Sequence, residues 1–346
     1  MKIIITGGCG FIGSNLIKYL LTIPNVEVVN IDKLTYSSNL LSLKNLTNNK
    51  KYFFINLDIV NTPKILEVFE QFQPNGLINL AAETHVDRSI DSPDLFLSSN
   101  IFGTYSLLEA SRIYLKKSKK SNFRFIHIST DEVYGELLSK KKKFNEKSSY
   151  WPKSPYSASK ACSDHLVMSW FHTYNVPVVI TNCGNNFGPS QHPEKLIPHT
   201  ILSAVNKKKI AVYGTGKNIR DWIYVQDHVE AIYKIFKKGT LGEKYNIGSN
   251  NELTNIEIVK LVCNILDQVK PIKKKSYKDL IEFVDDRPGH DFRYALNTKK
   301  INTTISWKAR YNFYEALFST VKWYIKEFPE WKRGLKKKYS LKRLGL

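Results

Sequence analysis

The chain has 346 residues, 42% of them hydrophobic, and a formal net charge of +21. This length exceeds one typical domain, so we expect two lobes, and the hydrophobic content is ample for a buried core. No apolar run approaches the roughly 20 residues that a membrane-spanning helix needs, and Met1-Lys2 leads straight into a strand-like run rather than into a signal peptide. These features argue against a membrane protein and predict a cytoplasmic one.

The positive charge is typical of nucleic-acid-binding or membrane-surface proteins. However, only nine of the 52 basic residues are arginine, and many lysines form short runs without interleaved aromatic residues. We therefore expect a solvated lysine-rich surface and no nucleic-acid or membrane partner, although the charge can help to attract an anionic substrate. The four cysteines lack metal-ligand spacing, which predicts reduced thiols and no metal site.

A glycine-rich turn follows the first expected strand, over residues 2–6. Its glycines, Gly7, Gly8, Gly10 and Gly13, satisfy both G-x-G-x-x-G and G-x-x-G-x-x-G. Such glycines permit a tight turn and let backbone amides approach a pyrophosphate at the helix N-terminus. The turn alone could equally be a structural bend, but the strand before it and the apolar-periodic helix after it favour a dinucleotide site.

The second expected strand, over residues 26–31, leads into Asp32. An acidic residue about 20 positions beyond the glycine-rich turn fits a ribose 2′-hydroxyl and repels a 2′-phosphate. We therefore expect NAD rather than NADP, although the adjacent Lys33 weakens this preference slightly.

Strand-like and helix-like segments continue to alternate to about residue 181. We expect further strands over 52–57, 76–80, 123–129 and 176–181, and helices over 63–72, 95–114 and 154–174. This alternation predicts an α/β fold with a Rossmann-type doubly wound parallel sheet.

Beyond residue 182 the pattern becomes irregular and richer in Pro, Gly and Asn. We expect an NAD-binding Rossmann domain over residues 1–181 and a smaller C-terminal lobe over 182–328 that mainly binds substrate. That lobe should include a helix over 256–266. A basic tail over 329–346 is expected to be peripheral.

Two short stretches carry candidate catalytic groups. Tyr156 and Lys160 lie four residues apart, on one face of the expected helix. A nearby ammonium stabilises a phenolate, so Lys160 should lower the pKa of Tyr156 and make it a base for an alcohol proton. Asp131 and Glu132 follow a strand, at the edge where such sheets bind ligands. A simple alcohol dehydrogenase does not need this carboxyl pair, whereas an enzyme that removes a proton and protonates a leaving hydroxide does.

In combination these motifs resemble the extended short-chain dehydrogenase/reductase family and, within it, the dTDP-glucose 4,6-dehydratases, from Met1 to about Tyr324. The resemblance is carried by residues 6–14, 30–36, 80–89, 129–135, 156–161, 185–189, 194–198, 219–222 and 286–291. Each motif alone is modest, but their order and spacing together are highly specific. The resemblance implies a homodimer in which the helices over 95–114 and 154–174 form an inter-subunit bundle.

The resemblance also implies a three-stage reaction on a nucleotide sugar, dTDP-glucose, with bound NAD. Tyr156, assisted by Lys160, takes the proton of the sugar C4 hydroxyl while hydride passes from C4 to NAD. Glu132 removes the C5 proton and Asp131 protonates the C6 hydroxyl, so that water leaves. Hydride then returns to C6, which gives a 4-keto-6-deoxy sugar, a rhamnose-type precursor. Thr130 is implied to hydrogen-bond the C4 oxygen.

Binding residues follow from the same resemblance. The implied cofactor residues are Gly7, Gly10, Phe11, Ile12, Gly13, Asp32, Lys33, Thr35, Asp58, Ile59, Leu80, Ala81, Ala82, Thr84, Ser99, Tyr156, Lys160 and Asn186. The implied substrate residues are Thr84, Thr130, Asn185, Lys195, Leu196, Tyr213, Arg220, Asn255, Arg287 and His290. Arg220 and Arg287 can grip diphosphate oxygens bidentately. The alternative for them is a surface ion pair with Asp221 or Asp286.

Three rival functions compete with this one, and the residues argue against the first two. A nucleotide-sugar 4-epimerase would use the same Tyr and Lys, but such epimerases lack the Asp131-Glu132 pair. A non-catalytic NAD-binding protein that engages RNA or acidic lipid would not need all four of Asp131, Glu132, Tyr156 and Lys160. Dehydratases of UDP-glucose, CDP-glucose or UDP-N-acetylglucosamine share the chemistry, and a thymine methyl group gives only about 1–3 kcal/mol of discrimination.

Overall fold

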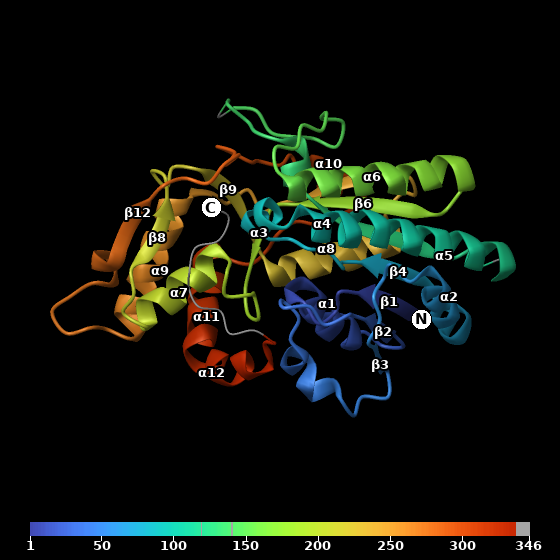
Figure 1. Ribbon diagram of the computed structural model, residues 1–346, viewed down its shortest axis with the longest axis horizontal. Helices are drawn as coiled ribbons and strands as arrows, with labels where there is room; N and C mark the ends of the chain where they lie inside the picture. Colours follow the sequence, from blue (N-terminus) through green and yellow to red (C-terminus); the bar gives the residue numbers. More distant parts are fainter. Residues whose placement is uncertain (119, 140, 337–346) are drawn as a thin grey trace.

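A seven-stranded sheet forms the centre of the molecule in the computed structural model, which describes residues 1–118, 120–139 and 141–336 (Figure 1). Its strand order is β10-β6-β5-β4-β1-β2-β3, and every neighbouring pair is parallel. The strands are β1 (Lys2–Thr6), β2 (Glu27–Ile31), β3 (Tyr52–Ile55), β4 (Gly76–Asn79), β5 (Arg124–Thr130), β6 (Val178–Cys183) and β10 (Lys244–Ile247). The predicted Rossmann-type α/β fold is confirmed.

Helices cover both faces of this sheet (Figure 1). One face carries α1 (Phe11–Leu21), α8 (Val225–Lys238) and α10 (Lys299–Ile305), and the other carries α2 (Thr62–Phe72), α5 (Gly103–Ser118) and α6 (Pro155–Tyr174). Side chains alternate along a strand. Ile3 and Ile5 of β1 therefore pack on the face that carries α1, α8 and α10, and Ile4 packs on the face that carries α2, α5 and α6. Both faces of β1 are therefore buried, as expected for a parallel sheet.

The long helix expected over residues 95–114 is present, but its hydrogen-bonding pattern changes along its length. It consists of α4 (Pro93–Phe96), a π-helical turn (Leu97–Phe102) and α5. Turns of this kind are frequent at functional sites. Here the π turn carries Ser99, whose side chain faces the pocket described below.

The second lobe is built from two small sheets and three longer helices. Its sheets have the orders β11-β9-β7 and β12-β8. The strands are β7 (Asn185–Phe187), β8 (Ile210–Tyr213), β9 (Ile219–Tyr224), β11 (Glu252–Thr254) and β12 (Ile281–Val284). The helices are α7 (Leu196–Val205), α9 (Asn255–Val269) and α11 (Phe313–Lys326), which share one apolar core. The helix expected over 256–266 corresponds to α9.

The remaining elements are short. They are α3 (Val86–Asp91), α12 (Phe328–Trp331) and 3₁₀ helices at Leu40–Leu46, Asp131–Tyr134, Tyr277–Leu280 and Lys332–Gly334. None of the helices within the described residues is long and apolar enough to cross a membrane.

The chain passes between the two lobes more than once. α8 packs against the Rossmann sheet and β10 pairs with β6 at its edge, although both follow residue 181. A single boundary at residue 181 therefore does not separate the lobes. The hydrophobic patterns of strands and helices do not show which sheet a strand far along the chain joins. A domain boundary drawn from these patterns is therefore limited.

The start of the expected peripheral tail is packed rather than free. Trp331 is buried, its indole Nε1 donates to Ser42 Oγ at 2.7 Å, and its carbonyl accepts from Asn39 Nδ2 at 2.7 Å. These contacts tie residues after α11 to the first lobe. The last part of the tail, residues 337–346, lies outside the described residues.

Candidate active site

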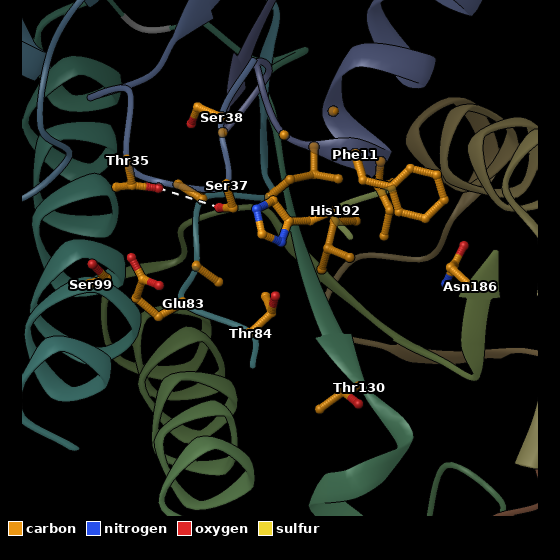
Figure 2. A pocket seen from close by; sticks show the side chains of 18 of the residues that line it. Phe11, Thr35, Ser37, Ser38, Glu83, Thr84, Ser99, Thr130, Asn186 and His192 are labelled. Atoms are coloured by element: carbon orange, nitrogen blue, oxygen red, sulfur yellow. Dashed lines mark hydrogen bonds between the residues drawn. The ribbon is translucent and has the colours of Figure 1, made fainter. Parts of the chain in front are cut away.

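A pocket opens at the carboxyl edge of the central sheet (Figure 2). Every residue expected to hold the cofactor and all five candidate catalytic residues line it. Figure 2 shows Thr130 at the end of its strand, with Ser99, Glu83 and Thr84 on one side of the hollow and Asn186 on the other. The sequence motifs, distant along the chain, therefore converge on one site.

The glycine-rich turn is shaped to hold an anion close to the backbone. Gly7 has a φ of 69° and donates its N–H to Ile31 O at 2.8 Å. A Cβ on Gly13 would lie 2.3 Å from Gly7 O, so no side chain fits there. α1 begins without a side-chain cap and without an acidic residue in its first turn. The first N–H groups of the helix and its positive dipole end are thus available to a pyrophosphate, which fits a dinucleotide.

Asp32 is buried and held in one orientation. Its carboxylate accepts hydrogen bonds from Cys9 N at 2.9 Å, Leu34 N at 2.7 Å and Ser38 Oγ at 2.8 Å. A carboxylate has about four acceptor positions, so one remains for a ribose hydroxyl. The geometry fits the acceptor role that the sequence predicts.

The ammonium group of Lys33 is already paired and is not placed to bind a 2′-phosphate. Its Nζ lies 3.2 Å from Asp58 Oδ2 and 3.1 Å from Ser99 Oγ. Because the carboxylate of Asp58 already partners this ammonium, the reservation that Lys33 placed on the NAD preference is weakened.

Glu194 is a pocket residue to which the sequence assigned no role. Its Oε2 accepts from Arg88 Nε at 2.9 Å and its Oε1 accepts from the Tyr36 hydroxyl at 2.9 Å. The Arg88 guanidinium stacks on the Tyr36 ring at 3.9 Å. Burial alone would raise the pKa of Glu194, but the hydrogen bond from His192 and neighbouring positive charges outweigh it and lower that pKa. Glu194 is therefore an ionised anchor.

This cluster of Tyr36, Arg88 and Glu194 joins three separate segments at the pocket. Lys195, the next residue, reaches back and donates to Thr84 O at 2.9 Å. Glu83, Ser37, Ser38, Gln191 and His192 also line the pocket without having been expected to. The motif at residues 194–198 carried the signal for Glu194, but only its neighbours Lys195 and Leu196 were read as binding residues.

The carboxyl pair sits directly beyond β5. Thr130 caps the 3₁₀ helix that follows, because its Oγ1 accepts from Glu132 N at 3.2 Å. The same hydroxyl donates to Asp131 Oδ1 at 3.3 Å. The capping residue of this 3₁₀ helix is therefore Thr130 and neither carboxyl. The two carboxyls are thus free for another purpose.

Asp131 and Glu132 experience different surroundings. Burial raises the pKa of Asp131 well above its usual range, and the charge of Glu132 adds to the rise. Burial also raises the pKa of Glu132, but the positive charges of Arg287, Arg220 and Lys195 oppose that rise. The pKa is raised for both carboxyls, but more strongly for Asp131, so Asp131 holds a proton more readily than Glu132 does, as an acid and a base at one pH require.

The expected effect of Lys160 on Tyr156 is not found. Burial, followed by the charge of Glu132, raises the pKa of Tyr156 well above its usual value, and the nearby Thr130 side chain opposes this only in part. Lys160 instead donates to Ile128 O at 2.8 Å, and burial lowers its pKa to about 8. The spacing placed both groups on one helix face correctly, but it could not reveal how deeply they are buried.

The expected substrate residues fall into two groups. Thr84, Thr130, Asn185 and Lys195 line the pocket. The others lie outside its lining, on or near the elements of the second lobe: Leu196, Tyr213, Arg220, Asn255, Arg287 and His290.

The two arginines do not form the surface ion pairs that were the alternative. Arg220 is buried and donates to Asp291 O at 2.9 Å. Arg287 Nη1 lies 3.1 Å from Asp87 Oδ1, and its Nε is buried without a hydrogen-bond partner among the described residues. Tyr213 donates to the other oxygen of Asp87 at 2.9 Å. A buried, unpartnered guanidinium donor close to Glu132 is suited to an anionic ligand.

Comparison with known proteins agrees with these observations. The family model described as GDP-mannose 4,6 dehydratase matches residues 4–320. A probable dTDP-glucose 4,6-dehydratase of Sinorhizobium fredii is 51% identical over 349 residues, which cover 100% of this chain and 99% of the relative.

Solved structures are similar over nearly the whole chain. The dTDP-glucose 4,6-dehydratase of Bacillus anthracis in complex with NAD has a TM-score of 0.85 at 40% identity, covering 96% of this chain and 99% of its own. DesIV, a dTDP-glucose 4,6-dehydratase of Streptomyces venezuelae with NAD and TYD bound, has a TM-score of 0.88 at 35% identity with the same coverage. The pocket, its acid–base groups and these similarities lead to one conclusion: the chain belongs to the dTDP-glucose 4,6-dehydratase family.

Proposed function

We propose that this protein is an NAD-dependent hydro-lyase, EC 4.2.1.46, that converts dTDP-glucose into dTDP-4-keto-6-deoxyglucose and water. The observation that carries this proposal is the placement of Asp131 and Glu132 in one pocket with Tyr156, Lys160 and the glycine-rich turn. An epimerase on this fold needs the Tyr and Lys but has no use for two further carboxyls in different electrostatic surroundings.

The residues of the first lobe fit NAD. The N–H groups at the start of α1 face the pyrophosphate position, and Asp32 offers its remaining acceptor position to the ribose. When bound, the cofactor accepts hydride from the sugar and later returns it. The chain's own groups supply every proton transfer.

The proton transfers follow the order of the chemistry. Tyr156 takes the proton of the C4 hydroxyl as that carbon is oxidised, with Lys160 and Thr130 beside it. The new ketone acidifies the C5 proton, which the Glu132 carboxylate removes. Asp131 gives its proton to the C6 hydroxyl, and water leaves. Hydride then reaches C6 and a proton returns to C5, so there is no net oxidation.

The nucleotide part of the substrate is proposed to supply most of its binding contacts with the second lobe. Arg220, Arg287 and Lys195 surround Glu132 with positive charge from the second lobe. The diphosphate of a nucleotide sugar can bridge to these groups while the sugar reaches the carboxyl pair. Tyr213 and His290, whose ring centroids lie 6.5 Å apart, are proposed to contact the base or ribose.

The cluster of Tyr36, Arg88 and Glu194 is proposed to retain NAD between turnovers. Gln191, His192 and Glu194 line the pocket on a segment that this cluster ties to the first lobe. Because the reaction returns NAD to its starting redox state in each cycle, the cofactor does not need to dissociate between turnovers. Fixing this segment over the pocket slows its release.

A homodimer is proposed from the solvent-exposed apolar side chains of α4, the π turn and α5. Leu95, Leu97, Phe102 and Tyr105 expose between 42% and 62% of their surface along α4, the π turn and α5. Neighbouring exposed apolar side chains of this size are typical of a subunit interface. A second copy of the same helices, together with α6, would cover them.

We further propose a cytoplasmic enzyme whose product feeds the synthesis of rhamnose-type deoxysugars. All four cysteines are free, which suits a reducing compartment. The 4-keto-6-deoxy sugar is the form on which later steps of such syntheses act.

Replacing Glu132 with Gln tests the proposed base. The variant should still oxidise C4, but its incorporation of solvent deuterium at C5 should fall by about 10²- to 10⁴-fold, because no carboxylate remains to take the proton. Mass spectrometry of product formed in D₂O measures this. Glu136→Gln is the matched control, since Glu136 lies outside the pocket and contacts Lys153. Normal exchange in Glu132→Gln would remove Glu132 from this role.

Replacing Glu194 with Gln tests cofactor retention. Gln keeps one acceptor oxygen but loses the charge, so one of the charge-assisted hydrogen bonds from Arg88 and Tyr36, of a kind worth about 1.5–3 kcal/mol, is lost and NAD should dissociate about 10- to 100-fold faster. Stopped-flow release of NAD measures the rate, and excess NAD should restore activity. Glu70→Gln, which removes the surface pair with Lys117, should leave release unchanged. Equal release rates in all three proteins would contradict the proposal.

Replacing Phe102 with Asp tests the dimer. Light scattering should report a dimer for the unaltered protein and a monomer for the variant, because a charge would be buried in the interface. Leu138→Asp, at a side chain 82% exposed in the loop whose Leu137 N–H donates to Arg293 O, should remain dimeric. An unaltered protein that is monomeric, or a Phe102→Asp variant that remains a dimer, would refute this interface.

A further inference from the structure

The loop that follows Asp32 forms one wall of the cofactor pocket. Thr35, Ser37 and Ser38 line the pocket from this loop, and Figure 2 shows all three at its edge. Ser38 Oγ donates to Asp32 Oδ1 at 2.8 Å, so the loop also helps to orient the carboxylate that is expected to accept from the ribose hydroxyl. The position of the loop therefore affects how well the adenosine end of NAD is held.

Asn39, the residue after Ser38, is 1% exposed and joins three parts of the chain. Its backbone N–H donates to Cys9 O of the glycine-rich turn at 2.8 Å. Its Oδ1 accepts from Leu41 N at 2.9 Å, and its Nδ2 donates to Trp331 O at 2.7 Å. A buried amide without a partner costs free energy, so the carbonyl of Trp331 stabilises Asn39 in this position.

The side chain of Trp331 holds the same loop through a second contact. Its indole Nε1 donates to Ser42 Oγ at 2.7 Å, three residues beyond Asn39. Its ring packs against the rings of Trp323 and Phe328, with centroids 5.7 Å away in each case, and both of these residues pack on the core of the second lobe. Figure 1 shows α12 beside the segment over residues 40–46. Trp331 thus connects a wall of the cofactor pocket to the second lobe.

α11, which carries Trp323, is itself anchored beside the pocket. The hydroxyl of Tyr324 on this helix donates to Gln191 O, and Tyr324 is 2% exposed. Gln191 lines the pocket, and its Nε2 donates to Asn186 O at 2.8 Å. The surface against which Trp331 packs therefore has a fixed position relative to the pocket, so that Trp331 can hold the loop in a defined place.

We propose that Trp331 is a positioning residue for NAD, which it affects through Asn39 and Ser42 although it does not line the pocket itself. Its contacts keep the loop over residues 35–42 ordered before the cofactor arrives. Without them, NAD binding must also order the loop, and the lost conformational entropy lowers the affinity. This role rests on the binding of NAD in the pocket and not on the reaction that follows.

Trp331→Ala removes the indole contact with Ser42 and the ring that fixes the carbonyl used by Asn39. Stopped-flow measurement should show bound NAD dissociating roughly 10-fold faster, because affinity changes of this kind appear mostly in the dissociation rate. The NAD concentration that gives half-maximal activity should rise, and the rate at saturating NAD should not change. Arg333→Ala is the matched control in the same segment, since it removes only the surface pair with Glu330, and it should release NAD as the unaltered protein does.

Gly334→Ala reaches the same loop without removing any atom of the core, and it decides the matter if Trp331→Ala does not fold. A Cβ on Gly334 would lie 2.0 Å from Asn39 Oδ1, so Asn39 must move. NAD should again dissociate faster. A lower unfolding temperature with unchanged release of NAD would reduce Trp331 to a packing residue and overturn the proposal.

ADP-ribose, which has the adenosine end of NAD but no nicotinamide, locates the effect. Calorimetric titration of NAD-free protein should show that Trp331→Ala weakens ADP-ribose and NAD by the same factor. Weaker NAD with unchanged ADP-ribose would contradict an effect through the loop after Asp32. These measurements contain no sugar, so they test Trp331 separately from the dehydratase reaction, which loss of water from dTDP-glucose tests on its own.

Discussion

Two adjacent carboxyl groups, one buried and one partly buried, lie at the end of β5, and both cannot be charged there without a large cost in free energy. Asp131 is buried and has only Arg220 as a positive neighbour, while Glu132 faces Arg220, Arg287 and Lys195. Burial therefore favours a proton on Asp131, whereas nearby cations limit the rise in the pKa of Glu132 and so favour its charged form by comparison. The chemistry proposed here depends on this difference. It supplies an acid and a base at neighbouring positions of the chain.

The fold produces this difference by bringing two lobes to one sheet edge. The parallel strands direct the glycine-rich turn, Asp32 and the carboxyl pair to the same side, as expected for open α/β sheets. α6 adds Tyr156 and Lys160 to the same pocket. The second lobe contributes the cations around Glu132, from β9 and the loop after β12. Because the chain crosses between lobes more than once, neither lobe forms the site alone.

The sequence allowed most of the fold and the site to be predicted, for physical reasons. Period-two and helical patterns are local, so the strands and helices of the first lobe were found within a few residues, and the motifs named the pocket residues. Other features depend on tertiary contact. These are the return of β10 to the sheet, the packing of Trp331 and the cluster of Tyr36, Arg88 and Glu194. The pKa of Tyr156 was mispredicted because burial, which spacing does not report, outweighs its charged neighbour.

The most direct test of this account follows one hydrogen atom. dTDP-glucose that carries deuterium at C4 is incubated with the protein, and the product is examined by mass spectrometry and NMR. Internal oxidation, elimination and reduction predict loss of water, deuterium in the C6 methyl group and no accumulation of free NADH. Loss of deuterium to solvent would contradict the internal return of hydride. An isomer of unchanged mass would instead mean that Asp131 and Glu132 do not act as an acid–base pair.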